Sequence, residues 1–268
     1  KVAGIKAHRQ THILIDQLIE CFGDKPLSKF TKYDLDKFKV WRLSQGDRRG
    51  EKGKLKPDER NAVKLSTANR GLAILKHLLI EAYDAGLISK NVTKGSKAID
   101  ADAETARTRT LTDEEERRLL ESCAGTRTVS YLRKGKEVKA TVDVDNPYLK
   151  AVIFLGLDSG MRRGEILKLE WKDLNFESGI ITILGTHTKT QKTRSVPMTN
   201  RTKVDVSLLP NCGESGRVFP FNDFKRSWAT ALKIAKIEGL EFRDLRRTFV
   251  TRLQSGGVSI GIAAELAG

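Results

Sequence analysis

The sequence predicts a mainly α-helical chain with one small antiparallel β-sheet, an all-helical first part being followed by an α+β second part. Apolar residues recur at helical spacing through residues 1–93, whereas the strand signals of the small sheet lie between residues 173 and 198. Residues 94–110 are polar and lack apolar periodicity, so we expect them to form an interdomain linker. The length of 268 residues suits two ordinary domains, expected at 1–93 and 111–268.

Three helices are expected in the first part. The first ends at Gly23, after apolar residues spaced three and four apart. The second begins after Thr31, because Asp34 three residues later completes a capping box. The third begins near Ser66 and ends at Gly86. Together they predict a compact helical domain.

The second part mixes helices with strands. Thr112 and Glu115 form a capping box that predicts the start of a helix. Ser259 is a plausible N-cap for the last helix. The other expected helices are 148–157, 162–169, 223–237 and 244–254, and the expected strands are 173–176, 180–184 and 193–198.

The charge balance indicates a polyanionic partner. The formal net charge is +15, and residues 1–110 carry +9 of it, so both halves are basic. Nucleic acid is the first candidate partner and an anionic membrane surface the second. The apolar runs are too short to span a membrane. Charge alone does not separate a DNA enzyme from a DNA-binding scaffold.

Cysteine and histidine usage excludes other classes. Three scattered cysteines form no disulfide framework or zinc spacing, which fits a reducing compartment. His8 and His12 have helical spacing but no third ligand nearby, so no metal site is expected. Because the chain begins at Lys1 and not at methionine, we expect it to be part of a longer protein.

Three basic clusters stand at the ends of predicted elements, at residues 160–165, 188–190 and 243–248. The transition state of phosphodiester cleavage spreads negative charge over the non-bridging oxygens, which guanidinium groups bind in a bidentate manner. A lysine can deliver a proton to the leaving oxygen. Two arginines and a loop lysine therefore suit phosphoryl transfer without a metal. Each cluster alone is also typical of a solvated surface.

The order of these clusters resembles the tyrosine recombinase (phage integrase) family. Ser159-Gly160-Met161-Arg162 is similar to its first arginine motif, and Thr188-Lys189-Thr190-Gln191-Lys192 to its lysine-bearing β-hairpin loop. Arg243-Asp244-Leu245-Arg246-Arg247-Thr248 is similar to its His-x-x-Arg motif, with arginine in place of histidine. The resemblance covers essentially the whole chain and implies a core-binding domain followed by a catalytic domain.

The resemblance implies a role for each matching residue. Arg162 and Arg246 would clamp the scissile phosphate, and Lys189 would be the general acid for the 5′-oxygen. Glu165 would orient the active-site cations, although an ordinary surface ion pair is the alternative. Arg243 could still donate to the phosphate but is a poor general base, because it stays protonated.

The last residues of the chain also contribute to the resemblance. Leu266-Ala267-Gly268 looks like the start of the family's Leu-Gly-His element, after which the nucleophilic tyrosine would follow. The tyrosines of the chain all precede Arg162, and they are Tyr33, Tyr83, Tyr131 and Tyr148. The resemblance therefore implies a catalytic domain that stops before its nucleophile.

Further basic residues are candidates for contacts with the DNA backbone. A polar stretch with interspersed acids is either a phosphate-binding loop or a solvated loop; its cations are Arg42, Arg48, Arg49, Lys52, Lys54, Lys56, Arg60 and Lys64. Lys192 and Arg194 flank the Lys189 loop and are also expected at the backbone. Residues 133–139 predict either a small hairpin over the DNA or a surface insertion.

The resemblance implies a site-specific recombinase that works through a 3′-phosphotyrosyl link, for integration or excision of a mobile element. No metal or nucleotide cofactor is implied. The implied partners are a double-stranded DNA recombination site, further copies of the chain in a tetramer on two sites, and accessory DNA-bending proteins. We expect no membrane partner and a cytoplasmic, nucleoid-associated location. Two alternatives stay open, a non-catalytic DNA-binding protein on the same fold and a type IB topoisomerase. A metal-dependent nuclease is disfavoured, because no carboxylate cluster accompanies the basic motifs.

Overall fold

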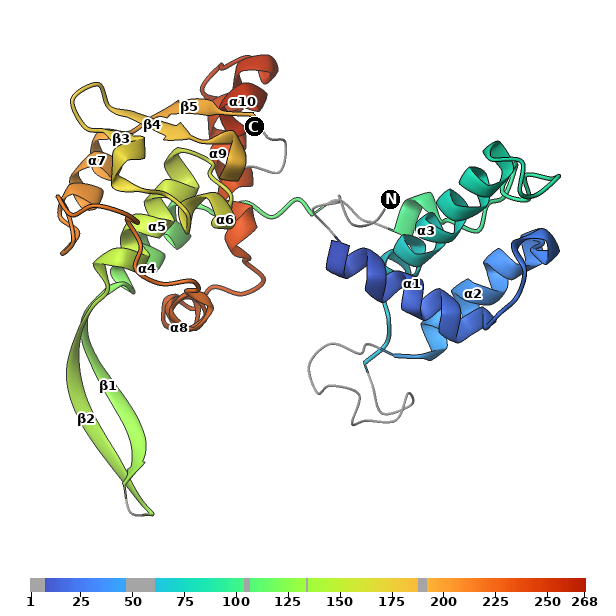
Figure 1. Ribbon diagram of the computed structural model, residues 1–268. Helices are drawn as coiled ribbons and strands as arrows, with labels where there is room; N and C mark the ends of the chain where they lie inside the picture. The colour runs from blue at the N-terminus through green and yellow to red at the C-terminus, as the bar shows by residue number, and fades with distance from the viewer. Residues whose placement is uncertain (1–7, 47–60, 104–106, 134, 188–191) are drawn as a thin grey trace. The chain divides into compact units, whose positions relative to one another are not determined.

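The chain folds into two compact units, residues 1–106 and 107–268, in a computed structural model (Figure 1). The structure describes residues 8–46, 61–103, 107–133, 135–187 and 192–268, and for residues 8, 127–133, 136, 139–144 and 187 it describes the backbone alone. The mainly helical class with a small antiparallel sheet is confirmed.

The described part of the first unit is helical. It contains α1 (His8–Phe22), a 3-10 turn (Leu27–Lys29), α2 (Lys32–Ser44), α3 (Leu65–Asp84) and a second 3-10 turn (Ala101–Ala103). The expected end at Gly23 is confirmed, with φ at +59°, and so is the capping box of Thr31 and Asp34. The core joins the three helices, and its most buried side chains include Leu35, Phe38, Leu72, Leu75 and Leu79. These helices pack closely enough that a Cβ at Gly71 would lie 2.6 Å from Phe38 Cε1.

The linker expected at residues 94–110 is wrong at both ends. Ala98 is buried in the core of the first unit, and Asn69 Nδ2 of α3 donates to the carbonyl of Asp100 at 2.7 Å. Arg107 belongs to the second unit, where it pairs with Asp244. Hydrogen bonds, an ion pair and one small buried alanine attach residues 94–110 to the two units. Because the segment has few large apolar residues, its sequence pattern is that of a linker.

The second unit is an α+β domain. Its elements are α4 (Asp113–Glu121), β1 (Ala124–Arg133), β2 (Lys136–Asp145), α5 (Pro147–Asp158), α6 (Arg163–Ile166), a 3-10 turn (Trp171–Asp173), β3 (Leu174–Asn175), β4 (Ile180–Ile183), a 3-10 turn (Gly185–His187), β5 (Arg194–Pro197), α7 (Asn200–Ser207), α8 (Lys225–Ala235), α9 (Phe242–Ser255) and α10 (Ile260–Ala267). The caps expected at Thr112 and Ser259 are confirmed. The helix expected at residues 162–169 is shorter, since α6 ends at Ile166. Helix α7 is an addition to the predicted elements.

Helix α5 forms the centre of this unit. Residues 151–157 are all buried, so the helix is apolar on every side and contacts α7, α9 and α6. The antiparallel sheet β3–β4–β5 pairs Leu174 with Ile181 and Ile183 with Arg194. Its buried positions, among them Ile181 and Val196, pack on the same core. Helix α10 contacts both α9 and the edge strand β5.

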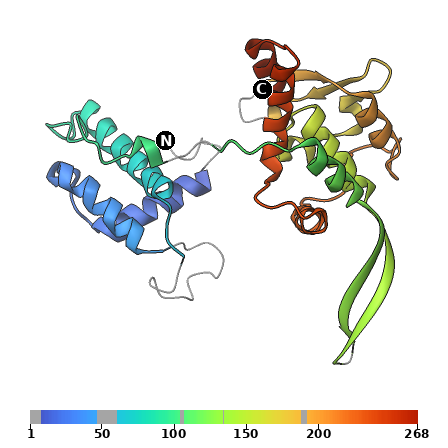
Figure 2. The ribbon, with the colours of Figure 1, turned by 180° about the vertical axis from the view of Figure 1, so that it is seen from behind.

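A long antiparallel hairpin, β1–β2, projects from the body of the second unit (Figures 1 and 2). Its ten paired positions run from Ala124–Asp145 at the base to Arg133–Lys136 at the tip. The described residues of the segment 133–139 thus belong to a hairpin whose paired strands extend far beyond that segment, while its expected place over the DNA stays a prediction. No helix in the described ranges is long and apolar enough to cross a membrane.

Candidate active site

The turn between α5 and α6 places Arg162. Gly160 adopts a φ of +61°, and a Cβ there would lie 2.4 Å from Phe249 Cδ1 of α9, so the turn requires glycine. Arg162 follows as the N-cap of α6, and its backbone N–H donates to Glu165 Oε2 at 2.9 Å. This capping contact fixes the start of the helix, and a second contact to Glu165, from Arg162 Nη1, holds the side chain.

Arg246 approaches the same point from α9. Its Nη1 donates to the carbonyl of Gly160 at 2.9 Å, which joins the α9 side chain to the Arg162 turn. Its Nη2 donates to the carbonyl oxygen of Gly268 at 2.8 Å, and Arg162 Nη2 donates to that same oxygen. The two guanidinium groups therefore converge on a single oxygen atom. Burial and the nearby Arg162 and Arg194 lower the pKa of Arg246 to about 10.

A buried carboxylate holds this arginine cluster together. Glu165 is 2% exposed, and its Oε1 accepts from Arg162 Nη1 at 2.9 Å. Arg194 Nη2 donates to Glu165 Oε2 at 2.8 Å. Burial raises the pKa of Glu165, but the hydrogen bonds from Arg194 and Arg162 outweigh it and hold that pKa below its usual value. Because Glu165 is buried, its ion pair with Arg162 is not an ordinary surface ion pair. That Glu165 orients the active-site cations stays a prediction.

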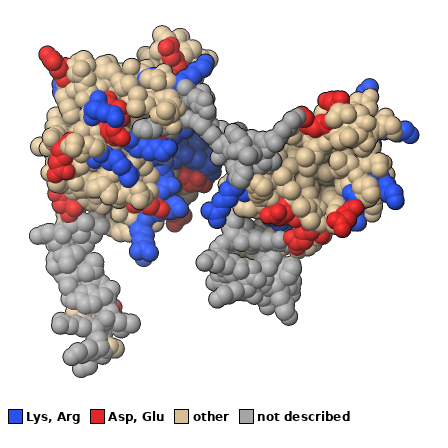
Figure 3. Space-filling view, viewed as in Figure 1, with Lys and Arg blue, Asp and Glu red and all other residues tan. Residues whose placement is uncertain are grey.

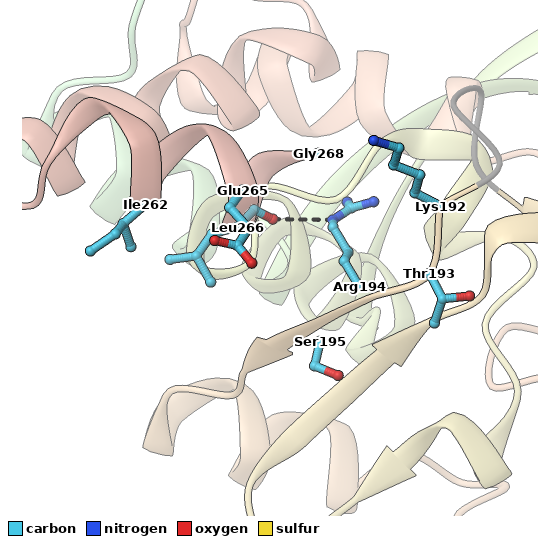
Figure 4. Close-up of a pocket in the computed structure, with 8 residues that line it drawn as sticks. All are labelled: Lys192, Thr193, Arg194, Ser195, Ile262, Glu265, Leu266 and Gly268. Atoms are coloured by element: carbon cyan, nitrogen blue, oxygen red, sulfur yellow. Dashed lines mark hydrogen bonds between the residues drawn. The ribbon is translucent and has the colours of Figure 1, made fainter.

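A cavity of 860 Å³ lies between β5 and α10, next to the cluster (Figure 4). Arg194 extends from β5 toward α10, and its Nε donates to the carbonyl of Leu266 at 3.1 Å. Lys192 and Glu265 also line this cavity. The sequence placed Arg194 at the DNA backbone. The structure instead brings its side chain, 9% exposed, into contact with Glu165.

The other expected catalytic residues have different positions. Lys189 lies outside the described residues. Arg243 is one turn before Arg246 on α9, its side chain is 69% exposed, and its Nε pairs with Glu241 at 2.8 Å. Among the described residues, no group of three or more histidine, cysteine or acidic side chains is placed to hold a metal ion.

The expected DNA contacts of the first unit divide into three groups. Arg42 is 4% exposed and its Nη1 donates to the carbonyl of Gly46 at 3.1 Å, so its expected contact with the DNA backbone is wrong. It belongs to the buried face of α2, which a charge count does not reveal. Lys64 is exposed at the start of α3. The remaining cations lie outside the described residues, and they are Arg48, Arg49, Lys52, Lys54, Lys56 and Arg60.

Sequence reasoning missed a second ionic network behind the site. Asp158, at the end of α5, accepts from Arg201 Nε at 2.7 Å and from Thr202 Oγ1 at 2.8 Å. Arg201 continues to Glu116, whose other oxygen pairs with Arg252 of α9 at 2.5 Å. These partners come from four helices far apart in the sequence, so no local pattern marks them. The network fixes the end of α5 four residues before Arg162.

Comparisons with known proteins agree with this geometry. The profile of the phage integrase family matches residues 109–268, and the chain belongs to this family. A shufflon-specific DNA recombinase of Escherichia coli is 29% identical over 167 residues, which are 61% of this chain and 38% of that protein. The tyrosine recombinase XerA of Pyrococcus horikoshii is 28% identical over 145 residues, 49% of this chain and 50% of that one. The chain thus spans half or less of these relatives' length.

Solved structures share the fold. A lambda integrase (75-356) dimer bound to a COC′ core site has a TM-score of 0.63 at 17% identity, covering 99% of this chain and 86% of that one. The Tn1549 transposon integrase in complex with circular intermediate DNA has a TM-score of 0.65 at 18% identity, covering 99% of this chain and 87% of that one.

On the second unit of our structure, Lys and Arg atoms gather around α6 and α9 (Figure 3).

Proposed function

We propose that this chain is the DNA-binding and catalytic part of a site-specific DNA recombinase of the tyrosine type. The observation that carries the proposal is the convergence of Arg162 and Arg246 on one oxygen atom, that of Gly268. A non-bridging phosphate oxygen at that point would accept from both guanidinium groups. Family membership supports the same reading.

The reaction has two balanced transfers. A tyrosine hydroxyl attacks the phosphorus, and the P–O(tyrosine) bond forms as the P–O5′ bond breaks. The tyrosine hydroxyl proton passes to solvent, and the leaving 5′-oxygen takes a proton from the general acid. In the second transfer a 5′-hydroxyl attacks the phosphorus, the new P–O5′ bond forms as the P–O(tyrosine) bond breaks, and the hydroxyl gives up a proton while the tyrosine oxygen gains one. The ester bond energy is conserved in the covalent link, so no nucleotide cofactor is needed.

Different residues of the chain take different parts in the first transfer. Arg162 and Arg246 neutralise the charge that develops on the non-bridging oxygens. Lys189 gives the proton to the 5′-oxygen. Arg243 donates to the phosphate from the exposed start of α9 and takes no proton, because a guanidinium stays charged.

The nucleophile, in this proposal, is a tyrosine that follows Gly268. Arg194 and Arg246 contact the carbonyls at the end of α10, so a residue beyond Gly268 would enter beside the clamp. Tyr148 is not placed for this role. It lies in the first turn of α5, about 15 Å along the helix from Asp158, and its hydroxyl bonds to Asn211.

The partner in this proposal is a double-stranded recombination site, and the assembled form is a tetramer on two such sites. The helical first unit would act as the core-binding domain, and Lys64 and Lys192 would bind backbone phosphates. Integration or excision of a mobile element, assisted by DNA-bending proteins, is the role that fits. Two relatives, named as a shufflon-specific DNA recombinase and an integrase of Salmonella phage P22, support this role.

Trapping the covalent link tests the function. The complete product of the gene that encodes this chain would be given duplexes that it selects from a random-sequence pool, each nicked next to the cleavage point so that the cut fragment diffuses away. We expect a denaturant-resistant protein–DNA adduct with a free 5′-hydroxyl, formed in the presence of a chelator. Arg162→Ala is the control and should form the adduct about 1,000-fold more slowly.

Other outcomes would contradict the proposal. Tight binding without an adduct would identify a non-catalytic DNA-binding protein. Relaxation of supercoiled DNA without any selected site would identify a type IB topoisomerase-like enzyme. Cleavage that a chelator abolishes would identify a metal-dependent nuclease.

A further inference from the structure

Arg194 is the third guanidinium of the cluster, and the motifs of the sequence give it no part in the chemistry. It is the first residue of β5, and its side chain is 9% exposed. It meets Glu165 at two points, Nη2 to Oε2 at 2.8 Å and Nη1 to Oε1 at 3.3 Å. A two-point pair of this kind fixes the orientation of the carboxylate as well as its position.

The same guanidinium also contacts the end of α10. Its Nε donates to the carbonyl of Leu266 at 3.1 Å (Figure 4). Its plane lies against Gly268, where a Cβ would come within 2.8 to 2.9 Å of Arg194 Nη1, Cζ and Nε. One side chain therefore joins β5 to α6 through Glu165 and to α10 through Leu266 and Gly268.

These contacts make Glu165 depend on Arg194. The carboxylate is 1% exposed and is faced by Arg162 from the start of α6, Arg194 from β5 and Arg246 from α9. Glu265 of α10 lines the cavity on the Arg194 side. Without Arg194, Glu165 would keep Arg162 as its only guanidinium in hydrogen-bond contact among the described residues. It would then draw that arginine away from the phosphate or take up a proton.

We propose that Arg194 is a positioning residue of the phosphate clamp, holding Glu165 so that Arg162 and Arg246 meet the same phosphate oxygen. The inference rests on the recombinase function proposed above and deepens it. It replaces the expected role of Arg194 as a contact to the DNA backbone, because its three nitrogens already donate to Glu165 and Leu266.

The test compares Arg194→Gln, Arg194→Lys and the unchanged protein in single-turnover adduct formation with the selected nicked duplex at saturating protein. We expect Arg194→Gln to slow adduct formation about 100-fold, since small displacements of a positioning group have effects of this order. Arg194→Lys should recover part of the rate, because it keeps a cation beside Glu165. Arg226→Gln, which removes an exposed arginine of α8, is the matched control and should stay within about twofold of the unchanged protein.

The pH profile gives a readout that loss of packing alone would not move. With Arg194 present, the pKa of Glu165 is lowered, so the carboxylate stays ionised throughout the working range. Without it, burial dominates and the pKa rises. The Arg194→Gln variant should therefore lose rate as the pH falls from about 8 to 5.5, a range in which an unshifted glutamate is ionised, whereas the unchanged protein should not show this limb.

A double variant separates positioning from DNA contact. If Arg194 acts through Glu165, then Glu165→Gln with Arg194→Gln should lose no more rate than the worse single variant. The salt dependence of DNA binding should stay as in the unchanged protein. Multiplied rate losses, or a salt slope reduced by about one, would overturn the inference. Should Arg194→Gln fail to fold, Arg194→Lys and Glu165→Gln form the same cycle.

The outcomes distinguish the two proposals. An unchanged protein that forms no adduct defeats the recombinase function, and this inference with it. An unchanged protein that forms the adduct, while Arg194→Gln does so at the same rate and with the same pH profile, defeats only the positioning role.

Discussion

Arg107, the first residue of the second unit, is joined to Asp244, the residue that follows Arg243 on α9, by a two-point ion pair. Its Nη2 lies 2.7 Å and its Nε 2.8 Å from the two oxygens of a carboxylate that is 0% exposed. Four residues further along, the N–H of Leu111 donates to Thr248 of α9. The segment that enters the second unit is thus fastened along the helix that carries Arg246.

Replacing Arg107 tests this attachment. Arg107→Ala would leave the buried Asp244 carboxylate with Arg247 as its remaining ion-pair partner among the described residues, and a buried charge that loses a partner is costly. We expect the melting temperature to fall by several degrees. Arg117→Ala is the matched control, because Arg117 pairs with Glu114 and Glu121 on the exposed face of α4. This variant should hardly change the melting temperature. Equal melting temperatures for both variants would contradict this view.

Gly160 should tolerate no side chain. Gly160→Ala combines a positive φ with a Cβ 2.4 Å from Phe249, so we expect it to lose about 2 kcal/mol or more of unfolding free energy. Gly164→Ala, in the neighbouring helix α6, has open space around its Cβ and should gain about 0.5 to 1 kcal/mol. Urea unfolding of both variants checks the contrast, and similar values for the two would refute it.

The clamp arginines should matter for chemistry more than for affinity. Arg162→Ala and Arg246→Ala should each reduce adduct formation by about 1,000-fold and leave the binding of the selected duplex within about threefold, because other cations hold the backbone. Rates and affinities measured on the same duplex decide this. Retained cleavage in either variant would remove that residue from the clamp.

Lys189 can be tested through its leaving group. Lys189→Ala should slow cleavage of an ordinary phosphodiester by about 100-fold or more, since the 5′-oxygen would leave without a proton. A duplex with 5′-bridging sulfur at the cleaved position needs no such proton and should restore the rate. If the sulfur substrate brings no recovery, another group is the general acid.

Acid should weaken the network behind the site through Asp158. Burial raises the pKa of Asp158, but hydrogen bonds from Arg201 and Thr199 outweigh it and keep the pKa below its usual value. A carboxyl with a lowered pKa in the folded state contributes stability that is present above its unfolded pKa, about 3.9, and is lost as the pH falls through the folded pKa. Asp158→Asn should cost about 2 kcal/mol at neutral pH.

The pH dependence is the sharper measurement for this residue. Between neutral pH and about pH 3, Asp158→Asn should lose less unfolding free energy than the unchanged protein. Asp113→Asn is the control, because that side chain is 99% exposed, and it should follow the unchanged protein. A parallel loss in all three proteins would exclude Asp158 as the group responsible.

Local patterns predicted most of the elements of this fold. The capping boxes at Thr31 and Thr112 mark helix starts that the structure confirms, because the contacts that make them lie within one turn. Helix α7 escaped prediction, since its polar sequence has a weak apolar face and its N-cap Thr199 depends on Asp158 from another helix. Elements stabilised by distant partners leave little local signal.

The site shows the same division. The motifs located Arg162, Glu165 and Arg246, and the structure brings these three together. They could not show that Arg194 turns inward or that Arg42 is buried, because the direction of a long cationic side chain depends on tertiary packing. Charge counts located the basic regions of the sequence but did not show which of their lysine and arginine side chains are exposed.

The base of the β1–β2 hairpin is closed by one hydrogen bond, from the N–H of Asn146 to the carbonyl of Cys123 at 2.8 Å. Residues 124–133 pair with residues 136–145 in one antiparallel ladder, while Cys123 belongs to the core and Asn146 caps α5. The two ends thus leave the body of the unit side by side. This makes the position a natural insertion point, where a hairpin could be shortened or exchanged for another module, or a fluorescent label added, without re-routing the chain around the arginine cluster.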